Sequence, residues 1–359
     1  MKNLKDNIEI TFNNATEYFE HLQNIEDNSL WIPTDTHTLS VKGEETILRL
    51  PDEDGTGIFI NSKELRECGY YSIINRCNVS GKGMKDVFIS APTVFADVVS
   101  SIMRSRKCSK LKLLVQGDKV SAVHSSSYTP ISMCKVFENA LNMCCTRFTV
   151  VNFSVAYWSW NFSSMNLHIN DTTLEEVYFD LLLKHFKKVK AIKMGLSLYS
   201  SDTAENSLTA VPYLDFDGTR LPLAGKAKQH HKGEVTEETC EKAISKAFIQ
   251  YQASMRSLAT LAEFNIKHIK NACIKAFVML KIPHKYCIEI TEAIDGTKQG
   301  TALDVYTELC KCFSLMEKKG LKKDTIFRYE EIISSLISLP KIRWEELDVG
   351  GTVAFSAQI

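Results

Sequence analysis

The sequence predicts an α+β protein: a mostly antiparallel sheet crossed by helices, followed by a helical C-terminal region with one long helix. Two observations lead to this fold class. Apolar and polar residues alternate through the middle third of the chain, as at Met165, Leu167 and Ile169, which is the period of a strand. From Glu234 to Ile282 no Gly or Pro occurs, and apolar residues recur at a mean spacing of about 3.6, the period of a helix.

The N-terminal part is predicted to hold a strand over Ile8–Phe12 and a short helix over Ala15–Gln23. Prolines and glycines between residues 33 and 57 then indicate irregular or short-strand structure. The pattern between Cys68 and Gly83 is ambiguous and predicts neither a helix nor a strand.

The clearest element of the middle third is a hairpin. Leu111–Gln116 and Lys119–His124 are apolar-rich runs separated by two residues, and a glycine at the first of these, Gly117, suits a type II′ turn. Further elements are predicted in order: a helix over Ser132–Asn142, strands over Phe148–Trp160 and Met165–Ile169, a helix from Thr172, and a strand over Ile192–Leu198. We expect the strand Met165–Ile169 to have one face in water, because Asn166 and His168 lie between its apolar residues.

The C-terminal third is predicted to be mainly helical. Its apolar stripe from Cys240 to Leu280 would make a helix of roughly 65–70 Å at about 1.5 Å per residue. That length exceeds what a compact domain needs, so the helix either breaks near Asn265 or organises an oligomer. Helices over Thr301–Lys318 and Asp324–Leu339 and a strand-like tail over Thr352–Ala357 follow. The expected layout is an acidic N-terminal segment (1–80), an α+β core with a basic surface (81–233) and a mainly helical region (234–359).

The composition predicts a cytoplasmic protein. Its 44% hydrophobic and 24% charged residues are typical of a globular chain. The N-terminus lacks the apolar run of a secretion signal, and no stretch of ~18 apolar residues predicts a membrane helix. The 11 cysteines are too sparse for a disulfide scaffold, so we expect buried, reduced thiols.

The charges are distributed unevenly along the chain. Residues 1–67 hold 6 Lys and Arg against 14 Asp and Glu, a net charge of −8, whereas residues 68–232 hold 20 against 12, a net charge of +8. An acidic segment next to a basic one indicates either a nucleic-acid surface or two parts that attract each other.

Basic runs flanking sheet aromatics are typical of single-strand binding, in which cations contact phosphates and bases stack on rings. Trp158 and Trp160 are two positions apart, so both side chains are expected on the same face of their strand, although two such rings also suit a core. The candidate nucleic-acid contacts are Arg104, Arg106, Lys107, Lys110, Lys112, Lys187, Lys188, Lys190, Lys226, Lys228, Lys232, Trp158 and Trp160.

No catalytic, metal or cofactor motif is recognisable. The chain has no phosphate loop, nucleophile elbow, H-E-x-x-H or paired C-x-x-C motif. Cys310 and Cys312 lie within a predicted helix, where residues two apart point to different faces, so they are interpreted as packing cysteines. His230 and His231 are interpreted as part of an exposed loop, and Asp215–Gly218 as a turn.

Three segments resemble one family. Leu113–Ile131, which reads LLVQGDKVSAVHSSSYTPI, resembles the signature of phage- and plasmid-like proteins catalogued as domain of unknown function 932. Leu196–Asp202 is similar to its strand that ends in a Ser/Asn-rich turn. Gly300–Glu308 resembles its G-T-x-x-D-x-Y helix start, although Thr307 and the following Leu309 depart from the commoner Asn-Ala. The resemblance covers roughly residues 85–359.

The family has no agreed activity and defines no catalytic residues. Its members occur mainly in phages, prophages and plasmids, so the resemblance implies a role in DNA replication, recombination or conflict with host defence inside a bacterium. Ser125 and Tyr128 do not predict a nucleophilic site, because only His124 is near enough in sequence to act as a base and adjacent strand residues point to opposite faces.

The first hypothesis is therefore a non-enzymatic, possibly oligomeric protein that binds single-stranded DNA. An alternative is a protein-interaction module whose acidic segment blocks a host defence or replication protein, and deletion of residues 1–67 would distinguish the two. A further alternative is a nucleic-acid-processing enzyme whose site is assembled from scattered acidic residues such as Asp202, Asp215 and Asp217.

Overall fold

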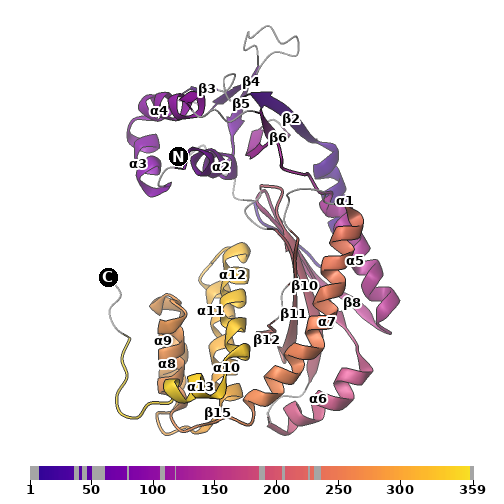
Figure 1. The fold of residues 1–359 in the computed structure, drawn as a ribbon, viewed down its shortest axis with the longest axis vertical. Helices are drawn as coiled ribbons and strands as arrows, with labels where there is room; N and C mark the ends of the chain where they lie inside the picture. Colours follow the sequence, from indigo (N-terminus) through magenta and orange to yellow (C-terminus); the bar gives the residue numbers. More distant parts are fainter. Residues whose placement is uncertain are drawn as a thin grey trace.

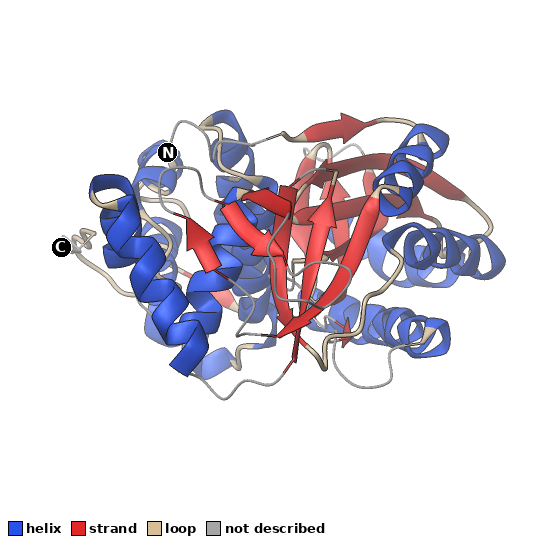
Figure 2. Cartoon of the chain, turned by 90° about the horizontal axis from the view of Figure 1, so that it is seen from above, coloured by secondary structure: helices blue, strands red, loops and turns tan. Residues whose placement is uncertain are grey.

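The computed structural model describes residues 8–35, 40–42, 47–50, 61–78, 81–105, 110–117, 119–185, 191–203, 207–224, 227–229 and 236–355. A small N-terminal lobe stands over a large lobe, and the two curve around a space that is open on one side (Figure 1). Seen from above, strands occupy the middle of the molecule, with helices on either side (Figure 2). The predicted α+β class, with antiparallel sheets and a helical C-terminal region, is confirmed.

The small lobe is built on a six-stranded sheet. Its strand order is β2 (Ser29–Asp35), β6 (Lys110–Gln116), β7 (Lys119–Ser125), β5 (Asn61–Leu65), β4 (Ile47–Leu50) and β3 (Ser40–Lys42). Only β5 and β7 pair in parallel. The helices are α2 (Glu67–Cys77), α3 (Gly81–Ser90) and α4 (Pro92–Ser105). Their buried residues, such as Tyr70 and Phe95, share one core with Leu113 and Val123 of the sheet.

The predicted hairpin is confirmed as β6 and β7. Gly117 begins its turn with a φ of +63°, a conformation that glycine adopts without the steric cost of a side chain. The ambiguous segment after Cys68 forms the helix α2. Gly69 lets this helix approach the sheet closely, because a Cβ there would lie 2.3 Å from the carbonyl oxygen of Val120 in β7.

The large lobe is built on a seven-stranded antiparallel sheet. Its order is β1 (Ile10–Phe12), β8 (Val151–Ser159), β9 (Phe162–Ile169), β10 (Ile192–Ser200), β11 (Leu208–Phe216) and β12 (Thr219–Pro222), with β13 (Ala227–Gln229) also on β11. Alternate residues such as Leu167 and Leu196 form one apolar face. The helices α1 (Ala15–Asp27), α5 (Met133–Arg147), α6 (Thr172–His185) and α7 (Glu237–Leu261) lie along this face (Figure 1).

The C-terminal helices lie on the opposite side of this sheet (Figure 1). They are α8 (Ile269–Met279), α9 (Ile288–Ala293), α10 (Ala302–Cys310), α11 (Cys312–Lys318), α12 (Lys323–Ser334) and α13 (Lys341–Leu347), with 3₁₀ turns at His284–Tyr286 and Ser335–Ser338. Both α10 and α12 contact β12. The expectation that Met165–Ile169 has a wet face is wrong, because these helices leave Asn166 only 3% exposed.

The predicted long helix breaks, as one of the two alternatives proposed. The helix α7 ends at Leu261, and the chain then forms β14 (Asn265–Ile266), which pairs with β15 (Gly300–Thr301). The apolar stripe continues across the break because α7 and α8 bury their residues in the same core, for example Leu258 and Cys273. The apolar stripe therefore indicates one core that two helices share, and not one continuous helix.

Strand pairing crosses the boundary at residue 80 between the first two parts of the expected layout. The strand β1 belongs to the large sheet, whereas β2 and β5 flank the hairpin in the small sheet. Deletion of residues 1–67 would thus remove strands from both lobes, so that truncation cannot separate binding from folding. The described part of the predicted C-terminal strand, residues 352–355, contains no strand, and residues 356–359 lie outside the description.

Within the described part of the chain, none of the helices combines the length and apolar character that crossing a bilayer requires.

Candidate binding cleft between the lobes

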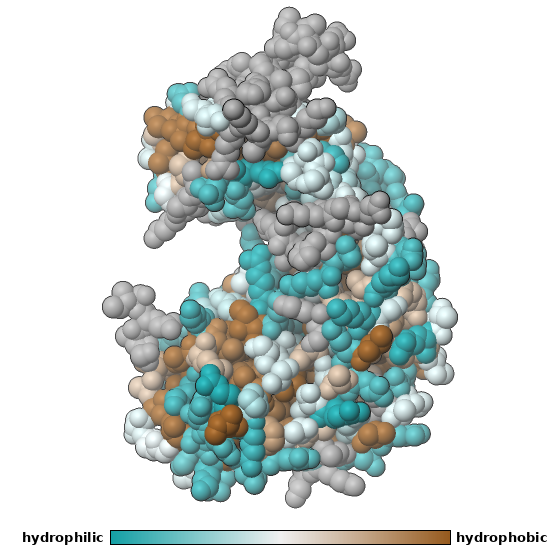
Figure 3. Space-filling view, viewed as in Figure 1, coloured by the Kyte–Doolittle hydropathy of each residue, from teal (hydrophilic) through white to brown (hydrophobic). Residues whose placement is uncertain are grey.

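A cleft of about 650 Å³ lies where the two lobes face each other. The small lobe lines it with the N-cap residue of α2, Arg66, and with one side of this helix, including Tyr71 and Asn75. The large lobe lines it with the turn between β8 and β9 and with the start of α12. Figure 3 shows this side of the molecule hollowed between the lobes. A volume of this size is within the range of ligand-binding pockets.

A stacked pair, Arg66 and Trp160, joins the lobes at this cleft. Arg66 is the N-cap residue of α2, and its guanidinium carbon lies 3.4 Å from the centroid of the Trp160 ring in the β8–β9 turn. Its Nη2 donates a hydrogen bond of 3.0 Å to the carbonyl oxygen of Gln116 at the end of β6. The guanidinium is thus fixed by the small lobe and lies over an aromatic ring of the large lobe.

The two predicted tryptophans differ in their surroundings. They do lie on the same side, with ring centroids 4.7 Å apart at an interplanar angle of 72°. Trp158 is only 4% exposed and packs edge-on against His21, 4.5 Å away, so it belongs to the core and cannot stack a ligand. Trp160 is half-buried and lines the cleft. Of the two predicted stacking residues, Trp160 alone is in a position to contact a ligand.

Two exposed cations extend the cleft along α12. Lys322, the N-cap residue, and Arg328 have side chains 52% and 54% exposed. The ammonium of Lys322 lies 3.9 Å from the carboxylate of Glu67 in the small lobe, and Arg328 lies 4.0 Å from Asp324. Both distances are at the long end for an ion pair, and exposed pairs of this kind contribute little to stability.

A buried polar network holds α12 on the sheet. Nε of Arg220 in β12 lies 2.8 Å from Oε1 of Glu330 in α12. Nη1 donates to Oδ1 of Asn166 at 2.9 Å, and Nη2 donates to Oγ of Ser197. The guanidinium also lies 3.8 Å from the ring centroid of Tyr213. Burial raises the pKa of Glu330, and the Arg220 charge opposes that rise. This network fixes the helix that presents Lys322 and Arg328 to the cleft.

The predicted basic contacts whose side chains the structure describes, Lys112 and Lys228, do not line the cleft. Lys112 donates a 2.9 Å hydrogen bond to the carbonyl oxygen of Tyr128, and Lys228 pairs with Glu331 at 3.3 Å. Arg104 lies in the last turn of α4 and Lys110 begins β6, but the description does not extend to their side chains. The remaining candidates lie outside the described residues: Arg106, Lys107, Lys187, Lys188, Lys190, Lys226 and Lys232.

Sequence reasoning missed three cations of the cleft, Arg66, Lys322 and Arg328. Arg66 lies within the acidic segment, and the other two precede or belong to a predicted helix. Local patterns give no signal for such residues, because only the approach of the two lobes brings them together.

The residues that resemble the family signature have structural contacts. The ring nitrogen Nε2 of His124 lies 2.8 Å from the carbonyl oxygen of Asp202, and the Tyr128 hydroxyl donates to the same oxygen at 3.1 Å. The first and second signature segments therefore meet at the junction between the lobes. Burial, and secondarily the charge of Glu26, raise the pKa of the Asp202 carboxyl to about 7.

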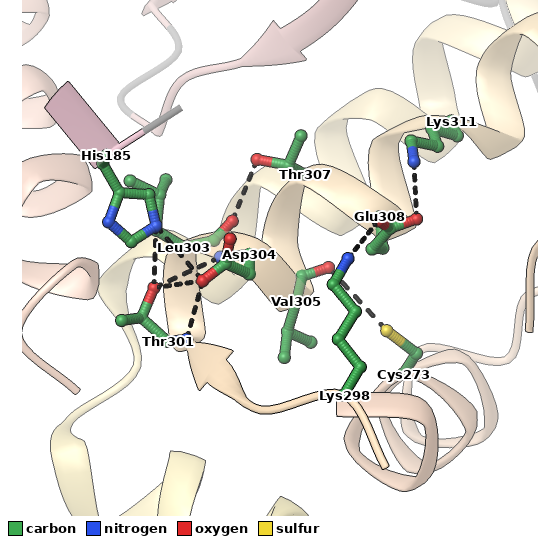
Figure 4. Close-up of polar contacts among 10 residues, drawn as sticks. All are labelled: His185, Cys273, Lys298, Thr301, Leu303, Asp304, Val305, Thr307, Glu308 and Lys311. Carbon is green, nitrogen blue, oxygen red and sulfur yellow. Dashed lines mark hydrogen bonds and ion pairs between the residues drawn. The ribbon is translucent and has the colours of Figure 1, made fainter. Parts of the chain in front are cut away.

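The third signature segment forms a helix cap. Thr301 accepts a bond from the amide of Asp304, and the Asp304 carboxylate accepts from the Thr301 amide at 2.7 Å, which makes a capping box for α10 (Figure 4). Nε2 of His185 lies 3.1 Å from Oδ2 of Asp304 and 3.2 Å from Oγ1 of Thr301. Both oxygens approach the same ring nitrogen, so His185 cannot relay a proton from the hydroxyl to the carboxylate.

Other possible catalytic groups are also accounted for by structure. Asp215 accepts a 2.6 Å hydrogen bond from the amide of Gly218 in the β11–β12 turn, which confirms the turn interpretation. Cys310 and Cys312 are buried, and burial raises the pKa of both thiols, as expected of packing cysteines. Across the residues that the structure describes, no group of three His, Cys, Asp or Glu side chains could hold a metal ion.

No protein-family model, no curated protein and no solved structure matches this chain.

Proposed function

We propose that the chain is a binding protein for single-stranded nucleic acid and that the cleft between the lobes is its binding site. The observation that carries this proposal is the position of Trp160, which is stacked on Arg66 and shares one cleft with the exposed cations Lys322 and Arg328. An aromatic platform beside cations is the combination that single-strand binding uses.

Both lobes contribute the two kinds of group that such a ligand needs. The small lobe supplies Tyr71 and Arg66, and the large lobe supplies Trp160, Lys322 and Arg328. Stacking of a base on an aromatic ring contributes about 1–3 kcal/mol, and each cation that neutralises a phosphate releases a counterion. The amides of Asn75 and Asn161 also line the cleft and can hydrogen-bond to base edges.

The resemblance to a phage- and plasmid-encoded family also supports binding of single-stranded nucleic acid, since single strands are intermediates of DNA replication and recombination. Single-stranded DNA in a bacterial cytoplasm is therefore the first ligand to test. A cleft of about 650 Å³ has room for a few unpaired nucleotides but not for a duplex.

The test is fluorescence anisotropy with labelled single-stranded and duplex oligonucleotides across a salt series. We expect preference for the single strand and affinity that falls steeply with salt. Trp160→Ala should weaken binding about 5- to 100-fold, which corresponds to the loss of one stacking contact. Lys322→Ala should weaken it and flatten the salt dependence.

Lys341→Ala is the matched control. It removes an exposed cation whose partner Glu345 lies 3.8 Å away, on α13 at the far end of the large lobe from the small lobe (Figure 1). This variant should bind like the native protein. Absence of binding at low salt, or equal weakening by the control, would overturn the proposal and direct attention to a protein partner.

A further inference from the structure

The ion pair between Glu67 and Lys322 connects the two lobes at the cleft. Glu67 is the first residue of α2 in the small lobe, and Lys322 is the N-cap residue of α12 in the large lobe. The carboxylate and the ammonium lie 3.9 Å apart, with side chains 28% and 52% exposed. Both residues line the same cleft as Trp160.

We propose that this ion pair is a latch, in which the carboxylate of Glu67 occupies the position that a ligand phosphate takes on Lys322. This inference rests on the proposed function. A backbone phosphate that enters the cleft displaces Glu67 from Lys322, so Glu67 competes with the ligand for this cation. The latch then lowers affinity and makes the protein select ligands that carry phosphates.

The geometry distinguishes Glu67 from the other carboxylate that pairs with a cleft cation. Asp324 is 11% exposed, and its Oδ1 accepts hydrogen bonds from the amide and the hydroxyl of Thr325 at 2.7 and 3.1 Å. Those bonds hold the Asp324 side chain in the first turn of α12 even when Arg328 contacts another group. Glu67 is more exposed and lies at the long limit of its ion pair. A phosphate therefore displaces Glu67 more readily than Asp324.

The chemistry of exchange favours the phosphate. An exposed carboxylate–ammonium pair contributes little free energy, because water solvates both groups nearly as well. A nucleic-acid strand adds stacking on Trp160 and releases condensed counterions, neither of which the carboxylate offers. Exchange of Glu67 for a phosphate on Lys322 is therefore favourable in free energy once a base stacks on Trp160.

The test compares single-strand affinity for four proteins: native, Glu67→Gln, Lys322→Ala and the double variant. Glu67→Gln should raise affinity about two- to fivefold at low salt, the loss of one screened competitor. It should also make affinity fall more steeply with salt, because salt screens the Glu67–Lys322 pair and so relieves the competition in the native protein alone. In the Lys322→Ala background the same substitution should change neither quantity.

Glu9→Gln is the matched control, because Glu9 is an exposed carboxylate that also lines the cleft. It removes one negative charge from the same cleft, so it measures how much affinity changes when the electrostatic field of the cleft becomes less negative. A gain in Glu67→Gln that equals the gain in Glu9→Gln, or that persists without Lys322, would overturn the latch while leaving nucleic-acid binding intact. Binding by none of the proteins at low salt would overturn the proposed function and the latch together.

Discussion

The ring of Tyr128 lies flat against the ring of His124, with centroids 3.8 Å apart and an interplanar angle of 6°. His124 lies near the end of β7 in the small sheet, and Tyr128 follows in the next turn. Both side chains reach the carbonyl oxygen of Asp202, which follows β10 in the large sheet. One backbone oxygen thus ties the two lobes together.

This junction makes a prediction about stability. Tyr128→Phe keeps the stacked ring but removes the hydroxyl that donates to Asp202, so the free energy of unfolding should fall by about 0.5–1.5 kcal/mol. Tyr128→Ala should cost about 3–5 kcal/mol, because it also empties a buried site. Urea denaturation measures both changes. Ser126→Ala, at an exposed position of the same turn, is the control and should be neutral; equal stability of Tyr128→Phe would show that the bond contributes nothing.

The Asp202 carboxyl predicts a pH dependence. Its pKa in the folded protein is raised to about 7 from 3.8, so the fold favours the neutral acid. Because the fold disfavours the charged form, this carboxyl lowers the free energy of unfolding wherever it would ionise in the unfolded chain. This loss is absent below about pH 4, grows as pH rises from about 4 to about 7, and is constant above that. Asp202→Asn removes this loss, so its melting temperature should exceed that of the native protein increasingly over this window.

Thermal melts of both proteins at a series of pH values between 4 and 8 make the comparison. Asp97→Asn, an exposed substitution on α4, should give a difference that does not change with pH in this range. A constant difference for Asp202→Asn as well would mean that this carboxyl titrates normally.

The sequence predicts elements that local periodicity and turn chemistry determine. The β6–β7 hairpin follows from the two-residue connection that Gly117 begins, and Ser132 was correctly placed at the start of α5, where it caps the helix by accepting a bond from the amide of Lys135. The helix α2 could not be predicted, because Gly69, which weakens a helical pattern, is present to admit the carbonyl of Val120.

The uneven charge pattern predicts that acidic and basic parts of the chain could attract each other. In the fold, one acidic residue of the N-terminal segment accepts hydrogen bonds from the start of a later helix. Glu26 of α1 accepts hydrogen bonds from the amide of Cys134 and the hydroxyl of Ser132 at the start of α5. Of the cleft residues discussed above, the sequence predicts only Trp160 as a binding residue. Arg66 and Lys322 line the same cleft because two sheets, each with its own strand order, pack against each other.

A glycine in the middle of the large sheet gives a third prediction. A Cβ at Gly195 would lie 2.1 Å from the Tyr213 ring, which is held over β10 by the Arg220 guanidinium and by a 3.3 Å bond from its hydroxyl to the Leu167 carbonyl. Because the ring cannot move away freely, Gly195→Ala should cost about 1–3 kcal/mol of unfolding free energy. Gly296→Ala is the control, since nothing lies within 4 Å of its Cβ position. Equal effects of the two substitutions would mean that the ring yields.

The pair of Arg220 and Glu330 gives the last prediction, tested by a double-mutant cycle. Arg220→Met leaves the Glu330 carboxylate buried without its cation, which should cost about 3–5 kcal/mol. Glu330→Leu leaves the guanidinium without its carboxylate and should cost a similar amount. The double variant replaces the pair with apolar side chains, so it should cost much less than the sum of the singles.

The acidity of Glu330 supplies a second readout for this cycle. Without Arg220, the folded-state pKa of Glu330 rises further, because the charge that opposed the effect of burial is gone. The Arg220→Met variant should therefore lose less stability at pH 5 than at pH 8, whereas the double variant, which has no carboxyl at position 330, should show no greater loss at pH 8 than at pH 5. Urea denaturation at the two pH values measures this. Additive singles with no difference between the two pH values would show that Arg220 and Glu330 contribute independently, and that their pairing does not stabilise the docking of α12.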